Sequence, residues 1–477
     1  MYKAEVPLYG DLVDIVQAVD SSVLAARGQR FDDIPIRHQI ERHGAIRLGT
    51  QHEMRMISRL FAVMGMFPVG YYDLNMVGFP LHGTAFRPTS EESLRKNPFR
   101  VFTTVLRANQ ITSPSVRKTA TEILSRRVLF SPRLCALIDA ALSPPPSSHP
   151  ATLLTAADAD DLITESLSVF KWHSRATVPL ATYLALQREH PMVADIVCFP
   201  SAHINHLTPR TLDIDAVQAE MVRRGLPAKD CIEGPPGGRR CEILLRQTSF
   251  KALEERVAFV SESDEESDAS GKSGGGGGVV RGTHTARFGE VEQRGAAVTR
   301  KGRDLYDRLL TEAIARHAAA GKSGRVSDLL RELFSENYPD DWTELRTKGL
   351  VYFRYKAAQG ELRGQAEAVL REARAPGAAV QVEQLLQAGL LTCEPITYED
   401  FLPFSAAGIF TSNLGGEGED GTERKFQGSG EASSRAELEE LLGCTIPSEI
   451  DMYDRLQRAS IRECEQALGL KAIVVAS

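Results

Sequence analysis

A short stretch rich in charged residues sets the strongest limit on how this chain can fold. It runs from Arg287 to Arg294 (RFGEVEQR) and is short enough to form one strand. In a strand, Glu290 and Glu292 share a face, with Phe288 beside them. A central strand can bury such carboxylates only where cations, hydrogen-bond donors or a metal ion surround them. The fold must therefore bring partners for these charges from other parts of the chain.

Two other stretches that could form strands contain imidazole groups: residues 41–47 (ERHGAIR) and 203–210 (HINHLTPR). In a strand over the second stretch, His203 and Asn205 share one face and His206 lies on the other, so only one histidine easily faces a given site. Two histidines and one carboxylate on one side of an iron ion leave the opposite positions open for substrate and oxygen. The three stretches together therefore indicate a metal centre that draws one ligand from each.

Spacing alone does not decide which residues are the ligands. His43 lies in the first stretch, but the chain contains 11 histidines, and short motifs often match by chance. His38, His52 and His82 lie nearby and compete with His43 for the same role. Each of these residues is either a metal ligand or a polar residue that is hydrogen-bonded to other protein groups.

Arg47 follows His43 by four residues. On a helix the two side chains point in the same direction, and on a strand they share a face because four is an even number. An arginine in this position can donate two hydrogen bonds to a carboxylate of a substrate that is bound at the metal. The alternative is an arginine on the surface or in an ordinary ion pair.

The composition argues against several other classes of protein. The net charge is −7 and the pI is about 6.0, whereas non-specific nucleic-acid binding needs a basic surface. The seven cysteines are scattered without a CxxC pair, which favours reduced thiols over disulfides or a structural zinc site. No apolar run is long enough to span a membrane, and the first residues show no targeting pattern. We therefore expect a cytoplasmic protein without nucleic-acid or membrane partners.

The spacing of apolar residues predicts a mixture of helices and strands. The predicted helices span residues 11–30, 51–66, 156–190, 213–224, 302–320, 325–337, 361–390 and 449–468. The predicted strands span 99–103, 193–200 with the histidine stretch after it, and 243–250, and residues 67–90 are predicted as strand and turn. Residues 44–49 fit a strand and the start of a helix equally well.

Residues 261–282 have a different composition, first acidic and then almost entirely glycine and serine. Such a segment buries too little apolar surface to offset the entropy that it loses on ordering. We predict a disordered insertion at the surface between two core strands, and a second flexible stretch at 414–432. Residues 1–260 and 283–477 are expected to form one catalytic unit together, in which 302–392 is a mainly helical subdomain.

Four longer motifs resemble those of one enzyme family. They are residues 203–215 (HINHLTPRTLDID), 244–255 (LLRQTSFKALEE), 287–295 (RFGEVEQRG) and 398–410 (YEDFLPFSAAGIF). Through them the chain resembles the 2-oxoadipate dioxygenase/decarboxylases, also called hydroxyglutarate synthases, of the vicinal oxygen chelate superfamily. The resemblance extends from about Gln39 to the C-terminal helix. It implies an α+β fold with a curled β-sheet core of paired βαβββ units, a metal site between these β modules, and large helical additions.

The resemblance also implies a cofactor and a set of ligands. The family uses Fe(2+), and its two histidines and one glutamate are matched by His43, His206 and Glu290. His203 and Glu292 are the alternative ligands. Both iron and manganese suit two histidines and a carboxylate, so iron is implied by the family and not by the donor set.

The implied reaction takes 2-oxoadipate and O2 to 2-hydroxyglutarate and CO2, so the expected partners are a small 2-oxo diacid and oxygen. The family's substrate arginine is matched by Arg47. A backbone contact to the substrate falls near Phe404, where relatives carry a smaller aliphatic residue. The alternatives are a related dioxygenase for another 2-oxo acid, and a non-catalytic metal-binding protein that uses the acidic segment to dock a partner.

Overall fold

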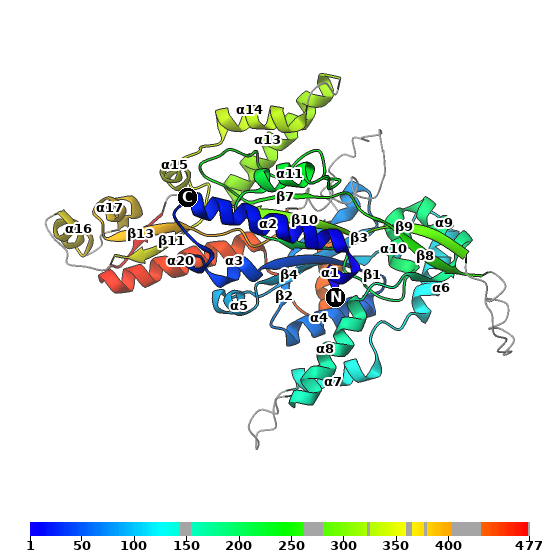
Figure 1. Cartoon of the computed structure of the whole chain (residues 1–477). Coiled ribbons are helices and arrows are strands. Elements are labelled where there is room, and N and C mark those ends of the chain that lie inside the picture. Colours follow the sequence, from blue (N-terminus) through cyan, green and yellow to red (C-terminus); the bar gives the residue numbers. More distant parts are fainter. Residues whose placement is uncertain are drawn as a thin grey trace, which may run out of the picture. The chain divides into compact units, whose positions relative to one another are not determined.

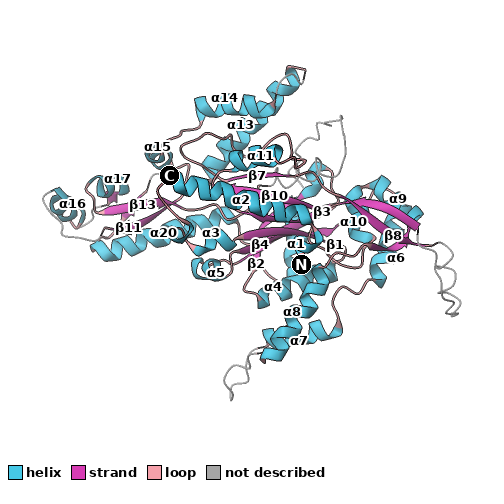
Figure 2. Cartoon of the chain, in the orientation of Figure 1, coloured by secondary structure: helices cyan, strands magenta, loops and turns pink. Residues whose placement is uncertain are grey.

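The structure, a computed structural model, contains both helices and strands in each part of the chain (Figure 1, Figure 2). The predicted insertion at 261–282 and the predicted flexible stretch at 414–432 lie almost entirely outside its described residues, as does Phe404. What was predicted for these segments stays a prediction. The described residues are 1–143, 154–261, 280–321, 325–358, 365–375, 379–402 and 431–475.

The chain folds into two compact units and passes between them several times. The first unit contains Met1–Lys229, Thr248–Glu292 and Pro403–Ile446, and the second contains Asp230–Gln247, Gln293–Leu402 and Pro447–Ser477. Each unit has its own hydrophobic core. The expected grouping of 1–260 with 283–477 in one catalytic unit stays a prediction.

Seven strands form the main sheet, in the order β2-β3-β4-β1-β6-β10-β7. Its first half is one β-α-β-β-β module made of β1 (Arg42–Leu48), α4 (Gln51–Val63), β2 (Phe67–Asp73), β3 (Leu81–Arg87) and β4 (Phe99–Leu106). Helix α4 begins with a capping box, in which Thr50 and Glu53 each bond the other's backbone N–H. β4 pairs antiparallel with β3 and parallel with β1, so the last strand of the module returns beside the first.

The second half of the main sheet repeats this order in part. β6 (His206–Pro209) precedes helix α11 (Ile214–Arg223), and β10 (Phe288–Arg294) runs parallel to β6 as β4 does to β1. β7 (Leu245–Ser249) lies on the other side of β10. The first strands of the two halves, β1 and β6, pair antiparallel in the middle of the sheet. The predicted α+β fold with a curled sheet of paired modules is confirmed.

A smaller sheet shows that the long helix predicted for 156–190 is wrong. The segment forms α8 (Ala156–Phe170), β5 (Arg175–Pro179) and α9 (Leu180–Glu189). β5 pairs with β8 (Glu254–Val260), which in turn pairs with β9 (Val280–Thr285). The spacing of residues within the segment does not reveal this strand, because its partner lies far along the chain.

The strand predicted for 193–200 is also wrong, because Pro191–Val197 forms helix α10. Proline suits the first helical position, and the side chain of His190 accepts a hydrogen bond from the backbone N–H of Met192. A short buried run of apolar residues does not distinguish a strand from a helix. The strand predicted for the histidine stretch begins only at His206, so His203 precedes it.

The other predicted helices are confirmed, most of them with shifted ends, except that the described part of 361–390 contains two helices with a short strand between them. None of the described helices is both long and apolar enough to cross a membrane. The first unit also contains α1 (Tyr2–Glu5), α2 (Pro7–Ala26), α3 (Ile36–Ile40), α5 (Glu91–Lys96), α6 (Pro114–Arg126), α7 (Pro132–Leu142) and α19 (Glu431–Leu442). The second unit contains α13 (Arg300–Ala319), α14 (Val326–Asn337), α15 (Trp342–Thr347), β11 (Phe353–Ala357), α16 (Gln365–Ala373), β12 (Val380–Gln381), α17 (Val382–Gln387), β13 (Leu391–Pro395), α20 (Glu449–Leu468) and β14 (Ile473–Val474).

Candidate metal centre

Four neighbouring strands place a row of polar side chains across the main sheet. Arg100 of β4 pairs with His43 of β1, and His43 pairs with Thr208 of β6. Thr208 Oγ1 donates a hydrogen bond to Oε1 of Glu290 on β10 at 3.2 Å, which extends the row to the fourth strand. Side chains that face each other across paired strands lie on the same face of the sheet. The register therefore brings His43 and Glu290 together although 247 positions separate them in the sequence.

His206 joins the same face of the sheet from β6. It lies two residues before Thr208, so their side chains share a face, and it pairs with Ala45 of β1. The small side chain of Ala45 leaves space over β1 for the imidazole ring. The rings of His43 and His206 accordingly meet edge to face, with centroids 5.6 Å apart.

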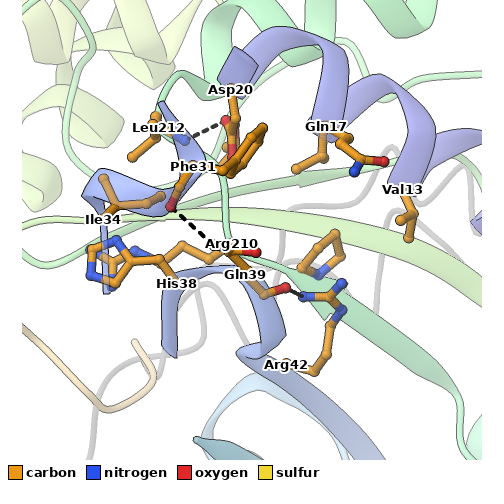
Figure 3. Close-up of a pocket in the computed structure, with 13 residues that line it drawn as sticks. Val13, Gln17, Asp20, Phe31, Ile34, His38, Gln39, Arg42, Arg210 and Leu212 are labelled. Carbon is orange, nitrogen blue, oxygen red and sulfur yellow. Dashed lines mark hydrogen bonds between the residues drawn. The ribbon is translucent and has the colours of Figure 1, made fainter. Parts of the chain in front are cut away.

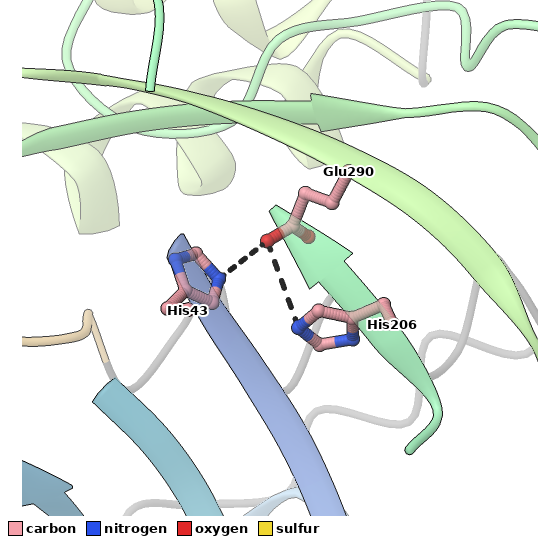
Figure 4. Close-up of side chains that lie close together, drawn as sticks. All are labelled: His43, His206 and Glu290. Carbon is pink, nitrogen blue, oxygen red and sulfur yellow. Dashed lines mark hydrogen bonds and ion pairs between the residues drawn. The ribbon is translucent and has the colours of Figure 1, made fainter. Parts of the chain in front are cut away.

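Two imidazoles and one carboxylate converge at this point (Figure 4). Nε2 of His43 lies 3.0 Å from Oε1 of Glu290, and Nε2 of His206 lies 3.8 Å from the same oxygen. All three residues are buried, with at most 5% of their surface exposed. Adjacent ligands of an octahedral ion, each about 2.1 Å from the metal, lie about 3 Å apart. The first distance matches this spacing and the second exceeds it by less than 1 Å, and the ligand atoms of the three residues all lie within 4.8 Å of one another.

The charges of the three side chains suit a metal ligand set. Burial lowers the pKa of His206 to about 3, so its ring is neutral. Burial alone would raise the pKa of Glu290, but His206 and His43 outweigh it and lower the pKa, so the carboxylate is ionised. Burial also opposes protonation of His43, but Glu292 and Glu290 outweigh it and raise the pKa of that ring. The ring of His43 thus lies between two carboxylates, with Nε2 facing Glu290 and Nδ1 facing Glu292, and this negative surrounding also favours a metal cation.

One oxygen of the group provides a direct test of whether a metal fits. Oε2 of Glu290 is buried and accepts no hydrogen bond from any residue that the structure describes. Leaving a buried acceptor without a partner costs about 1–3 kcal/mol, and more for a charged group. A divalent cation would satisfy this oxygen, and two imidazoles with one carboxylate are the donor set of non-haem iron oxygenases. The residues therefore fit a single divalent metal ion.

Glu292, the alternative ligand, lies behind His43. Its Oε2 is 2.9 Å from Nδ1 of His43, and its Oε1 accepts a hydrogen bond from Nη2 of Arg100 at 2.5 Å. A carboxylate behind a ligand histidine fixes the orientation of the ring and the nitrogen that carries the proton. Glu292 therefore turns Nε2 of His43 toward Glu290.

His203, the alternative to His206, lies in a second buried group with Asp195 of α10 and His284 of β9. Nη1 of Arg47 donates a hydrogen bond to Oδ2 of the same aspartate at 2.6 Å. The structure thus places His206 with Glu290 and His203 with Asp195. Arg47 lies in an ion pair, as one of the sequence-based alternatives had it.

The competing histidines lie elsewhere. His52 is exposed on α4, and His82 of β3 lies 3.3 Å from the hydroxyl of Tyr71. His38 lines a separate cavity of about 280 Å³ (Figure 3). The cavity is also lined by Arg42 and Arg210 but by no residue of the metal group. Among the described residues, none of the three competing histidines belongs to a group that could hold a metal.

Sequence reasoning missed three residues that surround these groups: Arg100, Asp195 and His284. Arg100 is charged within a correctly predicted apolar strand, and that contrast was a usable signal of a buried ion pair. Asp195 was hidden by the wrong strand prediction, and nothing in the local sequence marks His284. Their partners come from distant segments, so only the arrangement of the strands reveals them.

Known proteins resemble this chain over nearly its whole length. The family model of 2-oxoadipate dioxygenase/decarboxylase matches residues 1–413. A protein of that name from Pseudomonas putida is 44% identical over 98% of this chain and 95% of its own length. One from Escherichia coli is also 44% identical, over 97% of this chain and 95% of its own length. The hydroxyglutarate synthase from Pseudomonas putida, solved in complex with 2-oxoadipate, has a TM-score of 0.77 at 43% identity and covers 98% of this chain and 96% of that one.

Proposed function

The chain belongs to the 2-oxoadipate dioxygenase/decarboxylase family, and from that premise we propose that it converts 2-oxoadipate and O2 into 2-hydroxyglutarate and CO2 with Fe(2+). The observation that best supports the proposal is the buried group of His43, His206 and Glu290, whose ligand atoms lie within 4.8 Å of one another. When bound, iron(II) supplies the coordination of the 2-oxo acid and the activation of oxygen.

In this proposal His43, His206 and Glu290 bind the metal, and neighbouring side chains orient two of these ligands by hydrogen bonds. Thr208 donates to Oε1 of Glu290, and Glu292 bonds Nδ1 of His43. These contacts fix two of the three ligands before the metal arrives, which favours binding. The burial of all three keeps bulk water away from the reacting atoms.

Arg47 is the proposed partner of the far carboxylate of 2-oxoadipate. It lies four residues after His43 on the same face of β1, about 13 Å further along the strand. Burial is the main cause of the low pKa of His206, and the charge of Arg47 adds to it, so the guanidinium acts on the metal group electrostatically. A guanidinium can pair with a carboxylate through two parallel hydrogen bonds. The backbone contact near Phe404 stays a prediction.

The proposed reaction is tested with protein that has been loaded with iron(II) in the absence of air. On addition of O2 and 2-oxoadipate, we expect oxygen uptake and the formation of 2-hydroxyglutarate and CO2 in equal amounts, measured by an oxygen electrode and mass spectrometry. Phenylpyruvate and 2-oxohexanoate test the alternative that another 2-oxo acid is the substrate. Oxygen uptake with only one of these two acids would replace 2-oxoadipate as the proposed substrate and leave the proposed metal centre unchanged. No uptake with any of them, despite bound iron, contradicts the activity.

We expect Glu292→Gln to weaken iron(II) binding about 10- to 100-fold, the usual effect of removing a carboxylate behind a ligand histidine. The amide no longer offers His43 a charged acceptor. Competition with a chelator under anaerobic conditions measures the affinity. Glu41→Gln is the matched control, because Glu41 is a buried glutamate of the same unit that pairs with Arg37 and Arg210. Equal affinity in the two variants would show that Glu292 does not support the metal site.

A further inference from the structure

A second buried group in the first unit resembles the metal group in its residue types. It consists of Asp195, His203 and His284, each at most 4% exposed. Nε2 of His203 lies 3.1 Å from Oδ1 of Asp195, and Nε2 of His284 lies 2.9 Å from the same oxygen. The carboxylate is shielded from water, so its charge must be balanced inside the protein.

Arg47 balances this charge. Its Nη1 donates to Oδ2 of Asp195 at 2.6 Å, and both side chains are almost fully buried. Nδ2 of Asn205 makes a longer contact with the same oxygen at 3.4 Å. Burial alone would raise the pKa of Asp195, but His203 and Arg47 outweigh it and hold the pKa well below its usual range. Asp195 is therefore an anion that is tied on one side to the imidazoles and on the other to the guanidinium.

Protein groups contact both oxygens of Asp195, which distinguishes it from Glu290 of the metal group, whose Oε2 accepts no hydrogen bond from a described residue. The hydroxyl of Tyr183 lies 2.9 Å from Nδ1 of His284. If the hydroxyl donates to Nδ1, the proton of the ring lies on Nε2 and faces Asp195. A metal ion at the same oxygens would stand next to the guanidinium of Arg47, and like charges repel strongly in a buried site. The contacts therefore favour a carboxylate held by donors over a second metal site.

Aromatic rings hold the two imidazoles in place. Trp172 meets His203 edge to face with centroids 4.7 Å apart and stacks on His284 at 5.8 Å. The ring centroids of Phe199 and His284 lie 4.7 Å apart. Close packing of this kind leaves the side chains few alternative rotamers. Asp195 is consequently held by donors that cannot easily move.

We propose that Asp195, itself held by His203 and His284, positions the guanidinium of Arg47 and so sets the length of the diacid that the site accepts. This inference rests on the proposed function, in which Arg47 receives the far carboxylate. An arginine whose guanidinium is already held by a buried carboxylate loses less conformational freedom when it binds a ligand. The guanidinium then stays at a fixed distance from His43, the proposed metal ligand on the same strand. Asp195 is thus a positioning residue that acts through Arg47.

The test compares Asp195→Asn with wild type in anaerobic calorimetric titrations of the iron-loaded protein. The ligands are 2-oxoadipate, 2-oxoglutarate, which is one methylene shorter, and 2-oxohexanoate, which lacks the far carboxylate. We expect wild type to prefer 2-oxoadipate to 2-oxoglutarate about 10- to 200-fold, the range for one methylene in a fitted site. In the variant this preference should fall about tenfold or more, while iron content and the affinity for 2-oxohexanoate stay unchanged.

The ratio of the affinities for 2-oxoadipate and 2-oxoglutarate distinguishes a positioning role of Asp195 from a purely electrostatic role. If Asp195 only altered the electrostatic field around the guanidinium of Arg47, the variant would change the affinities for both diacids by the same factor. The ratio would then stay intact, and that result would overturn the proposal. Two metal ions per wild-type chain and one in the variant would also overturn it, because the second group would then bind metal itself. If wild type bound 2-oxoadipate but consumed no oxygen, the proposed reaction would be contradicted. The ratio of the two diacid affinities would still test the role of Asp195.

Two further variants protect the test against misfolding. Asp20→Asn is the matched control, because Asp20 is another buried aspartate of the first unit, bonded to Thr211 and Leu212 at 2.7 and 2.8 Å. It should keep all three wild-type affinities. His284→Gln weakens one of the contacts that hold Asp195 and should lower the ratio by a smaller factor. If Asp195→Asn does not fold, an unchanged ratio in His284→Gln overturns the proposal.

Discussion

Replacement of His206 with alanine is expected to abolish iron binding and turnover together. His206 supplies one of three converging ligand atoms, and its ring is neutral because burial lowers its pKa to about 3. The loss of a residue that merely orients a ligand reduces metal affinity about 10- to 100-fold, so the loss of the ligand itself should exceed that range. Iron content after anaerobic loading and oxygen uptake with 2-oxoadipate measure the two effects.

A stability measurement separates a lost ligand from a misfolded protein. Iron at a concentration of 100 times its Kd should stabilise wild type by about 2.7 kcal/mol, and this gain should vanish in His206→Ala. The metal-free fold should survive, because Glu290 keeps its contacts with His43 and Thr208 at 3.0 and 3.2 Å. His52→Ala is the control, since this histidine is exposed on α4. Full turnover in His206→Ala, or iron loss in His52→Ala, would refute the ligand assignment.

Replacement of Arg47 with alanine is expected to weaken the use of 2-oxoadipate severely while iron stays bound. Arg47 contributes no ligand atom to the metal group. Removing one member of a buried charged pair costs about 2–5 kcal/mol, which corresponds to a loss of about 30-fold to several thousandfold in kcat/KM. Oxygen uptake gives the kinetic constants. With 2-oxohexanoate, wild type and variant should behave alike, because this acid lacks the far carboxylate that Arg47 is proposed to bind.

The same substitution should destabilise the fold, because it removes the cation beside Asp195. The two charges are 2.6 Å apart and almost fully buried, and breaking such a pair reduces the free energy of unfolding by about 3–5 kcal/mol. The double variant Arg47→Ala/Asp195→Asn should regain part of this stability but not the affinity for 2-oxoadipate. Urea unfolding and anaerobic titration measure the two quantities. If Arg47→Ala had the KM of wild type for 2-oxoadipate, Arg47 would not be part of the substrate site.

Helix ends could be predicted from the sequence because their signals are local. α11 begins where Asp213 accepts a hydrogen bond from the backbone N–H of Ala216, and α20 ends at Gly469, whose φ is 65°. Both ends agree closely with the predicted helices at 213–224 and 449–468. Each signal lies within a few residues of the boundary that it determines.

In the two wrong segments apolar spacing did not reveal the structure, although Pro191 at the start of α10 was a local helix signal. The segment 156–190 contains β5, which is a strand because β8 pairs with it. The segment 193–200 contains α10, whose residues from Met192 to Val197 are all buried. Burial on every side removes the periodic pattern that separates a helix from a strand. In both segments the tertiary environment decided the structure.

For the candidate site, the sequence indicated the three stretches but left two choices within them open. The structure brings His206 and Glu290 together with His43 and places His203 beside Asp195. Which histidine shares the face of His43 follows from where the strand begins, because β6 starts at His206. That starting point depends on pairing with β1, which no local pattern encodes.

The sequence by itself thus determined three stretches whose side chains can bind a metal and, wherever a stretch forms a strand, which of its side chains share a face. Only the tertiary structure decided their partners, such as Arg100 with Glu292 and Arg47 with Asp195. The physical reason is the range of the interactions. Alternation along a strand and caps at a helix end depend on residues a few positions apart. The partner of a buried charge depends on which distant strands and helices become neighbours.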